Sequence, residues 1–441
     1  MKFSRFNIYK KYNDNEYWIY NTLTTAVVLI DKNIFEKIFL KKNFDIDDDN
    51  FNKLSEMGFF IEDNFDELEY LNDLRKSVIS SNKNIADIMI APTMDCNARC
   101  YYCFEKNSHK EKMSLETADN VVSYLKKYWN GDLLNITWFG GEPLMATDVI
   151  DYISKKLVQN HIRFTSKITT NGFNLTKEIV ERAIKYWHTN KIQVTIDGLF
   201  EEYNRIKNYK NIDGIDPFEN VINNIKISLK LKMKIKIRIN FDPLKKERAI
   251  NLMEYLQEEF KVYDNFSVYF APIDDDKISS ITEKFRDLEE HPFLSLIKVG
   301  QKYGYYSKND RGKDKNFLYD DKGILVNLKL YPSPTNCYAS CPCVFAIDSK
   351  GDLYKCHRIL GKGAKYCSGN VRTGVIKNEI YNFFCNTKLS FSECNTCKIL
   401  PICQGGCKIN AFMYKDTHAC SPIKSIVNEL IEIYLKEEMS C

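Results

Sequence analysis

The chain has 441 residues, of which 44% are hydrophobic and 28% are charged, as in a soluble globular protein of two or three domains. Its 63 lysines and arginines exceed its 59 aspartates and glutamates by only four, which argues against a nucleic-acid partner. No apolar segment reaches the roughly 18 residues that span a bilayer, and the N-terminus lacks the apolar core of a signal peptide. The sequence therefore predicts a cytoplasmic protein with neither a nucleic-acid nor a membrane partner.

Cysteine is frequent and unevenly placed. The chain contains 15 cysteines, and twelve of them follow residue 336. Disulfides are rare in a reducing compartment, and an odd number of cysteines cannot all pair within one chain. Clustering of this kind favours metal ligation and places most of it near the C-terminus.

Residues 1–62 read as a small α/β module. Alternating and β-branched runs predict strands at 3–8, 17–20, 25–30 and 59–61, and helical patterns span 32–41 and 47–57. This order fits a winged-helix-like module. It resembles the precursor-recognition element of many ribosomal-peptide maturases, which binds a leader peptide as an added strand. The alternative is a packing extension of the domain that follows.

The next segments predict a linker and the main fold. Residues 63–84 are charged, with leucines near helical spacing, and predict a linker helix. From residue 85 to 305, six strand patterns alternate with amphipathic helices, which indicates a parallel sheet with helices outside. The chain is too short here for eight strands, so the predicted fold is α/β with a partial (β/α)6 TIM barrel. The predicted strands span 85–93, 133–139, 164–170, 191–197, 234–241 and 265–271.

The C-terminal part has a different character. The polar stretch 307–316 suggests a boundary, and residues 306–441 form a predicted cysteine-rich domain with few helices. Residues 422–438 carry a helical apolar face and predict a C-terminal helix.

Three cysteines directly after the first barrel strand carry the strongest signal. Cys96, Cys100 and Cys103 have the spacing C-x3-C-x2-C, so one loop can aim three thiolates at one point. Three thiolates do not complete a tetrahedral zinc site, and they leave one iron of a cubic 4Fe–4S cluster open. This loop resembles the signature of the radical S-adenosylmethionine (SAM) enzymes. The resemblance implies a 4Fe–4S cluster on these cysteines, with SAM at the open iron, in an open six-unit barrel.

The resemblance also implies which residues contact SAM. In similar enzymes a glycine turn after the second strand binds the amino group, and the ends of the third and fourth strands contact the ribose and carboxylate. An arginine pairs with the carboxylate, and the aromatic residue before the third cysteine packs on adenine. The matching positions are Gly140, Gly141, Glu142 and Pro143, then Thr169 and Asn171, then Thr195 and Asp197, then Arg205, and Tyr102. A plain surface arginine is the alternative for Arg205. Arg238 and Asn240 end the fifth strand, where they face either the site or solvent.

The C-terminal cysteines follow a second specific pattern. Cys356 lies five residues after Gly351, and a C-x2-C-x5-C-x3-C run follows. The pattern resembles the SPASM domain, which carries two auxiliary 4Fe–4S clusters. The resemblance implies that Cys337, Cys341, Cys356 and Cys407 hold the first auxiliary cluster, and that Cys394, Cys397, Cys403 and Cys420 hold the second.

Alternatives stay open at these cysteines. Cys337, Cys341 and Cys343 compete at the first cluster, and we choose Cys337 and Cys341 because Cys343 is too close to Gly351. The first cluster could instead keep an open iron that binds a substrate thiolate. Zinc is the alternative occupant of Cys-x2-Cys pairs. The remaining predictions are three free thiols, Cys367, Cys385 and Cys441, and a structural histidine, His357.

These features together predict a radical SAM enzyme. Such an enzyme cleaves SAM reductively to a 5′-deoxyadenosyl radical, which abstracts hydrogen from the substrate. SPASM enzymes act largely on peptides and proteins, and the N-terminal module favours a ribosomally made precursor peptide. The predicted product is a thioether cross-link, and the predicted electron donor is of the flavodoxin or ferredoxin type. No residue stands out as a general acid or base.

Three other functions remain as alternatives. The first is formation of a carbon–carbon or other cross-link. The second is an anaerobic sulfatase-maturating, formylglycine-generating enzyme, against which the 84 residues before the barrel count. The third is a non-catalytic metal-cluster scaffold that binds peptide, which would leave the glycine turn at Gly140 unexplained.

Overall fold

The computed structural model of the chain describes most of its residues. The described ranges are 1–40, 49–81, 85–210, 212, 214–273, 294–296, 325–326, 337–386, 392–413, 420–421 and 423–439. The predicted boundary at 307–316 and Cys441 lie outside them. Within these ranges, no helix is both long enough and apolar enough to cross a membrane.

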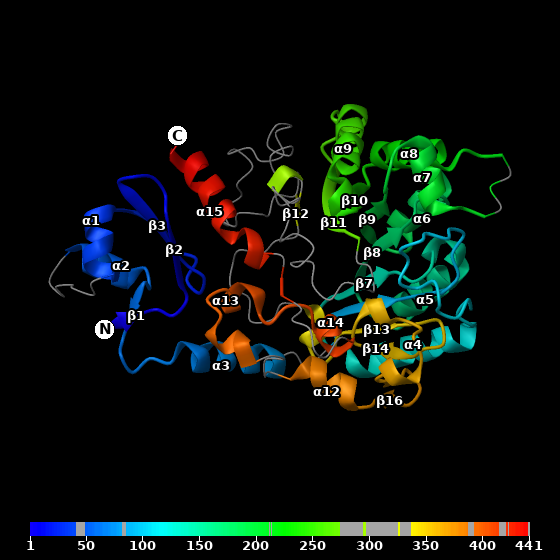
Figure 1. Cartoon of the computed structure of the whole chain (residues 1–441). Coiled ribbons are helices and arrows are strands. Elements are labelled where there is room, and N and C mark those ends of the chain that lie inside the picture. The colour runs from blue at the N-terminus through cyan, green and yellow to red at the C-terminus, as the bar shows by residue number, and fades with distance from the viewer. Residues whose placement is uncertain are drawn as a thin grey trace.

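Six parallel strands form the centre of the molecule. They lie side by side in sequence order, and each neighbouring pair is parallel. This arrangement confirms the predicted α/β fold with a partial barrel (Figure 1). The strands are β6 Asp87–Ile90, β7 Leu134–Trp138, β8 Phe164–Thr170, β9 Thr189–Thr195, β10 Lys234–Phe241 and β11 Phe266–Pro272.

Among the described residues, six helices pack against one face of this sheet. The helices are α4 Leu115–Tyr128, α5 Thr147–Gln159, α6 Lys177–Lys185, α7 Phe200–Lys207, α8 Pro217–Lys230 and α9 Lys246–Phe260. Ser114, Thr176 and Asp216 cap three of them by accepting a backbone N–H bond. Buried isoleucine and valine side chains of the strands pack against these helices. On the other face, several strand residues, among them Thr169, Thr195 and Arg238, are polar and only partly buried.

The cysteine-rich region continues the barrel sheet. β13 Phe345–Ile347 pairs in parallel with β6, and β14 Leu353–Tyr354 extends the same sheet. At the opposite edge, β12 Leu325–Val326 pairs with β11. The first auxiliary cysteines are therefore fixed to the strand that leads into the cysteine loop. The further elements are β15 Gly369–Asn370, β16 Gly374–Val375, α12 Glu379–Cys385, α13 Leu400–Cys403, α14 Lys408–Met413 and α15 Ile423–Met439.

The N-terminal module consists of an antiparallel sheet, two short helices and a strand pair. The sheet order is β2-β3-β4, and β1 pairs with β5. One face of the sheet packs against the module's own helices, and its Trp18 and Tyr20 join the core that contains α15. The elements are β1 Lys2–Phe3, β2 Asn7–Lys11, β3 Glu16–Asn21, β4 Val27–Asp31, α1 Lys32–Phe35, a π-helical turn Glu36–Leu40, α2 Asp49–Glu56 and β5 Phe60–Ile61.

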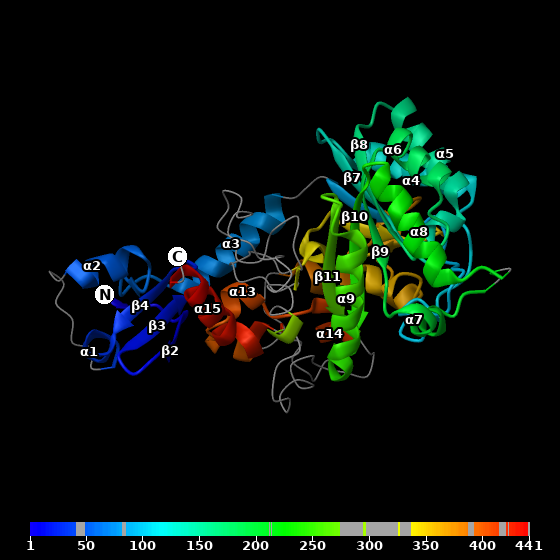
Figure 2. The same cartoon turned by 90° about the horizontal axis from the view of Figure 1, so that it is seen from above.

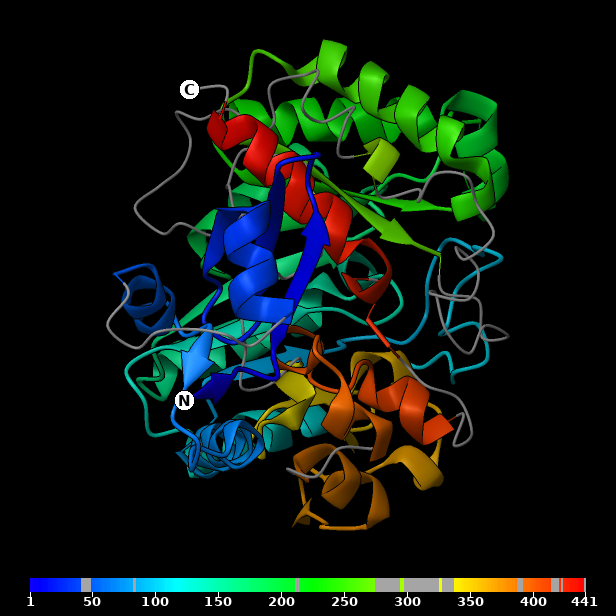
Figure 3. The same cartoon turned by 60° about the vertical axis from the view of Figure 1, so that its left-hand side comes forward.

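Helices α13 and α15 lie between the module and the barrel in two perpendicular views (Figures 1 and 2). Figure 3 shows α15 alongside the module's sheet, and Lys10 of β2 forms an ion pair of 2.9 Å with Glu432 of α15. The two ends of the chain therefore pack against each other.

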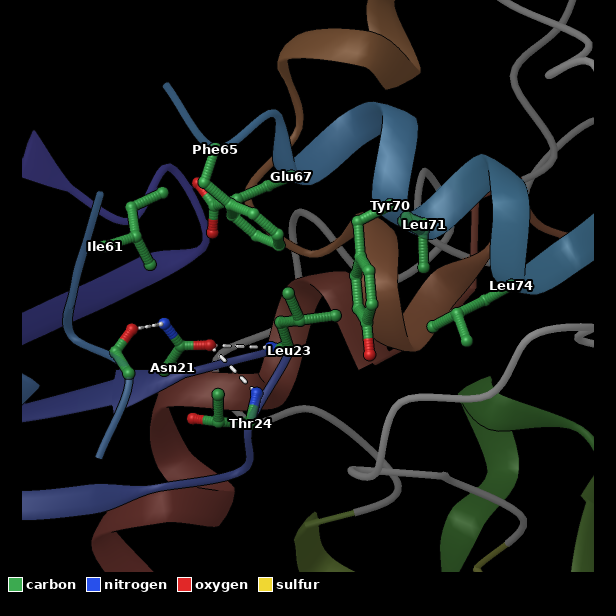
Figure 4. A pocket seen from close by; sticks show the side chains of 10 residues that line it. Asn21, Leu23, Thr24, Ile61, Phe65, Glu67, Tyr70, Leu71 and Leu74 are labelled. Atoms are coloured by element: carbon green, nitrogen blue, oxygen red, sulfur yellow. Dashed lines mark hydrogen bonds between the residues drawn. The ribbon is translucent and has the colours of Figure 1, made fainter. Parts of the chain in front are cut away.

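The predicted linker helix is α3 Glu67–Ser81, and it is a packed element. Leu71 is 1% exposed and forms a small core with Phe6 and Leu400. Glu67 is buried and accepts hydrogen bonds from Ser4 and from the backbone N–H of Arg5. A pocket lies between α3 and the module, lined by Leu23, Ile61, Phe65, Tyr70, Leu71 and Leu74 among others, and none of the predicted site residues lines it (Figure 4).

Candidate radical SAM site

The cysteine loop after β6 is held from several sides. The backbone N–H of Cys96 donates to the Asp95 carboxylate at 2.8 Å. The N–H of Arg99 donates to the carbonyl of Lys207, and that of Lys210 donates to the carbonyl of Asn97, both at 2.8 Å. The segment at the end of α7 therefore clamps the loop that carries the three thiols.

The glycine turn after β7 packs directly on the chain that precedes the cysteines. The N–H of Gly141 donates to Thr93 O at 3.1 Å, and that of Glu142 donates to Asp95 O at 2.8 Å. A Cβ on Gly141 would lie 2.0 Å from Asp95 O, and one on Gly140 would lie 2.4 Å from Thr93 O. The two glycines thus allow the turn to pack on the backbone before the cysteines. The sequence analysis predicted only that this turn contacts SAM. Contact of Gly140 to Pro143 with SAM stays a prediction.

Glu142 joins the ends of two neighbouring strands. Its side chain is 1% exposed, and its carboxylate accepts bonds from Leu144 N at 3.0 Å, Thr170 Oγ1 at 2.7 Å and Asn171 N at 2.8 Å. Burial raises the pKa of Glu142, and these three donors act in the opposite direction. Asn171 in turn donates from Nδ2 to Asn97 Oδ1 at 2.7 Å inside the cysteine loop. Glu142 and Asn171 therefore form one network with the loop.

A buried charge network lies on the other side of the loop. Lys207 Nζ is 2.7 Å from Asp197 Oδ2, and the two side chains are 3% and 1% exposed. Tyr102 donates its hydroxyl proton to the same Asp197 oxygen, and the Asn240 side chain donates to Tyr102 at 3.3 Å. Burial by itself lowers the pKa of Lys207, but the Asp197 carboxylate acts in the opposite direction, and the pKa lies well above its usual value. The ammonium group is therefore charged.

Arg205 is not part of this network. Its side chain is 72% exposed, and its guanidinium group lies 3.8 Å from Glu202. Lys207, two residues further on α7, is the cation that points inward. Sequence reasoning missed Lys207 because nothing in the motif shows which face of α7 is buried, although a lysine at the end of that helix was a visible candidate. Tyr102, Asp197 and Asn171 are brought together around the loop, and Thr169 and Thr195 are partly buried residues of β8 and β9.

The three thiols suit a shared cationic cofactor. Burial is the main cause that raises the pKa of Cys96 to about 12 and the pKa of Cys103 to about 11. Repulsion between neighbouring thiolates raises both pKa values further. Binding to iron would compensate for this repulsion. No three His, Cys, Asp or Glu side chains of the described chain converge on a single ion position. A cubic cluster distributes its ligands over separate irons, so the donor set fits a 4Fe–4S cluster with three thiolates.

The second predicted auxiliary set is brought together. Burial raises the pKa of Cys394 to about 11, and Cys403, Cys420 and Cys397 add to the rise. The backbone N–H of Ser421 donates to the sulfur of Cys403 at 3.4 Å. All four cysteines therefore surround one region beside α13, and they fit one four-thiolate cluster.

The first predicted auxiliary set is only partly brought together. Burial raises the pKa of Cys356 to about 12, with Cys337 and Cys407 as further contributors, so these three lie near one another. Cys341 has Lys355 and Cys385 as its main charged neighbours.

Lys355 lies beside a second group of cysteines, which shares Cys337 with the first. Its Nζ donates to the carbonyl of Cys341 at 2.6 Å, and Cys385, Cys341, Cys343 and Cys337 all act on its charge. Cys385, predicted as a free thiol, therefore belongs to a group that the sequence did not indicate.

His357 packs against residues that flank the cysteine loop and the glycine turn. Its ring centroid is 5.3 Å from that of Phe139, before the glycine turn, and 5.9 Å from that of Phe104, after the last loop cysteine. The Tyr338 hydroxyl and His357 Nδ1 are 2.7 Å apart. Burial, with Arg238 and Arg358, lowers the pKa of His357 to about 3, so the ring is neutral. These contacts fit the predicted structural histidine.

Comparison with known proteins agrees with this geometry. Residues 90–264 match the family model of the Radical SAM superfamily. The cysteine-type anaerobic sulfatase-maturating enzyme of Clostridium perfringens is 24% identical over 368 residues, which cover 73% of this chain and 88% of that enzyme.

Solved structures share the fold. Native anSMEcpe with bound AdoMet and Cp18Cys peptide has a TM-score of 0.57 at 18% identity, covering 79% of this chain and 98% of that one. Streptococcus suis SuiB bound to precursor peptide SuiA has a TM-score of 0.53 at 16% identity, covering 95% of this chain and 98% of that one. Residues 90–264 of this chain therefore form a radical SAM domain, and the chain is a radical SAM enzyme.

Proposed function

We propose that this enzyme modifies a ribosomally made precursor peptide and forms a thioether between a cysteine sulfur and a carbon of another residue. The observation that carries the proposal is the open edge of β4 in the N-terminal module. Among the described strands, β4 pairs only with β3, so its other edge can take a peptide as a further strand. The similarity to SuiB, solved with its precursor peptide, extends over 95% of this chain and supports the same role.

The hydrogen-bond register identifies the edge groups that would bind. Asn21 N donates to Ala26 O at 2.9 Å, and Lys32 N donates to Asn15 O at 2.8 Å. Hydrogen-bonded and non-bonded pairs alternate in an antiparallel ladder, so the pair of Trp18 and Leu29 is a non-bonded one. The backbone N–H and C=O of Leu29 therefore point away from β3, toward an added strand.

The radical SAM domain supplies the chemistry. When bound, SAM and a reduced 4Fe–4S cluster provide the radical that takes a hydrogen atom from the substrate. Cys96, Cys100 and Cys103 would hold that cluster. Lys207, with Asp197, would place a fixed positive charge beside it, suited to the SAM carboxylate, in the role that the sequence pattern assigned to Arg205.

The grouping of Cys337, Cys356 and Cys407 supports a thioether product. We assign Cys341 to the group beside Lys355, which would leave this cluster with three thiolates, and a substrate cysteine would then complete the set. Cross-linking joins the sulfur to carbon, releases the thiol proton, and leaves one electron for an auxiliary cluster. The electron for SAM cleavage would come from a flavodoxin- or ferredoxin-type donor. The peptide thus loses two hydrogen atoms overall.

The test compares Leu29→Pro with Leu29→Ala. Both variants lose the leucine side chain, but only proline removes the outward N–H. The probe is the translated product of a short cysteine-bearing open reading frame, to be sought among the genes adjacent to this one. We expect peptide binding by fluorescence anisotropy to fall at least about tenfold for L29P relative to L29A, while SAM cleavage without peptide stays equal. Equal peptide affinity in the two variants would overturn edge binding. Deleting residues 1–62 is less clean, because it would also uncover α15.

Formylglycine formation is the second candidate, favoured by the similarity to the sulfatase-maturating enzyme. The two reactions differ in the fate of sulfur. A thioether keeps the sulfur and removes two hydrogens, whereas converting cysteine to formylglycine removes the sulfur. Fragment mass spectra of the precursor peptide and of a sulfatase-motif peptide, assayed side by side, separate them.

A further inference from the structure

Arg75 of α3 is a buried cation with an unused donor. Its residue is 5% exposed, and its Nε donates to Gln404 Oε1 at 2.6 Å, while one terminal nitrogen donates to Asn72 Oδ1 at 3.2 Å. The other terminal nitrogen is buried and has no hydrogen-bond partner among the described residues. An unpaired buried donor on a charged group is costly, so this nitrogen calls for an acceptor.

Two cysteines of the predicted second auxiliary set, Cys394 and Cys403, lie near Arg75. Burial lowers the pKa of Arg75 to about 10, and the charges of Cys394 and Cys403 act against that fall, so the guanidinium is charged at neutral pH. Leu71, one helical turn earlier, packs with Leu400 in a core that also contacts Cys394 and Cys397. Gln404, the partner of Nε, directly follows Cys403. One face of α3 therefore rests on the second auxiliary cysteine set.

We propose that the free terminal nitrogen of Arg75 donates a hydrogen bond to a sulfur of the cluster held by Cys394, Cys397, Cys403 and Cys420, and thereby raises its reduction potential. This inference rests on the proposed second auxiliary cluster. Four thiolates give such a cluster a net negative charge, and reduction adds one further negative charge. A fixed cation and an N–H donor stabilise the reduced form more than the oxidised form. α3 also borders the N-terminal module, so the module and this cluster share one helix.

A purely structural role for Arg75 makes a different prediction. The bond to Gln404 would then hold α3 on α13, and its loss would lower thermal stability without moving a reduction potential. The potential therefore separates the two roles. The charge-matched control is Lys76→Leu, because Lys76 is the next residue on the same helix but its side chain is 62% exposed.

The experiment uses the full chain with Cys96, Cys100 and Cys103 changed to alanine, reconstituted anaerobically with iron and sulfide. EPR-monitored redox titration then reports the auxiliary clusters alone. In Arg75→Leu we expect one of two auxiliary potentials to become more negative while the other stays fixed, with a smaller shift in Arg75→Lys and none in K76L. Arg75→Lys keeps the buried charge, so it provides a folded variant if R75L does not fold.

Two contrary results are distinguishable. If the triple-alanine protein binds about eight irons and neither potential moves in R75L or R75K, the role of Arg75 is wrong and the proposed clusters stand. If that protein binds only about four irons and keeps them when Cys394 is also changed to alanine, the second auxiliary cluster is wrong and the inference on Arg75 fails with it.

Discussion

Lys207 and Asp197 form an ion pair of 2.7 Å in which both side chains are nearly inaccessible, directly beside the tyrosine of the cysteine loop. The backbone carbonyl of Lys207 also accepts a bond from Arg99 within that loop. One buried pair therefore couples the end of α7 to the three thiols.

Removing the negative partner should destabilise the domain. Asp197→Asn leaves the Lys207 charge buried without its counter-ion, so we expect a loss of about 3 kcal/mol in the free energy of unfolding. Denaturant titration measures it. Asp148→Asn breaks an exposed pair with Lys112 and should cost less than about 1 kcal/mol. Equal losses of unfolding free energy in the two variants would mean that the buried pair stabilises the domain no more than the exposed pair.

Gly141→Ala should loosen the cysteine loop. The added Cβ would lie 2.0 Å from Asp95 O, so either the glycine turn or the segment before Cys96 must move. We expect a destabilisation of about 1–3 kcal/mol and weaker retention of iron at the loop after gel filtration. Gly131→Ala is the control, because its Cβ would meet nothing closer than 3.7 Å. Wild-type iron retention in G141A would contradict the packing role of this glycine.

Glu142→Gln should weaken SAM binding through the strand ends. The carboxylate accepts three donors, and the amide nitrogen of glutamine would face at least one of them. An unmet buried donor costs about 1–3 kcal/mol, and the shift should displace Asn171 from the loop. Equilibrium dialysis with SAM checks this, with exposed Glu116→Gln as the control. Unchanged SAM affinity in E142Q would show that this network does not support the site.

The cysteine grouping makes a prediction for iron content. Cys356 lies with Cys337 and Cys407, whereas Cys341 lies with Lys355 and Cys385. We therefore expect Cys356→Ala to lose about four irons and Cys341→Ala to keep them all. Iron and sulfide analysis of the two reconstituted variants gives the answer. Equal loss in both would return Cys341 to the first auxiliary cluster, as the sequence pattern predicts.

The sequence predicted the barrel closely. Strand β8 begins and ends where predicted, at 164 and 170, and its residues alternate between buried and more exposed positions. The cysteine loop and glycine turn were also found from sequence, because their spacing is fixed by one cofactor. These motifs lie on neighbouring strands, and local sequence reports them well.

Contacts between distant segments were not predictable. Whether Arg205 or Lys207 points inward depends on the rotation of α7 about its axis, because residues two positions apart on a helix point to nearly opposite sides. The predicted linker helix α3 is packed because Leu400, more than 300 residues later, covers Leu71. Similarly, Lys355, which is buried directly after β14, donates its ammonium group to the carbonyl of Cys341, fourteen residues earlier. None of these contacts can be recognised from the spacing of residue types in either segment alone.

The central claim is that this radical SAM enzyme cross-links a peptide through sulfur. The most direct measurement is high-resolution mass spectrometry of the cysteine-bearing precursor peptide after anaerobic turnover with SAM and reductant, with 5′-deoxyadenosine counted in parallel. We predict that the peptide loses two hydrogen atoms, keeps its sulfur, and yields one 5′-deoxyadenosine for each cross-link located by fragmentation. Loss of sulfur from the peptide, or SAM cleavage that leaves the peptide unchanged, would contradict the claim.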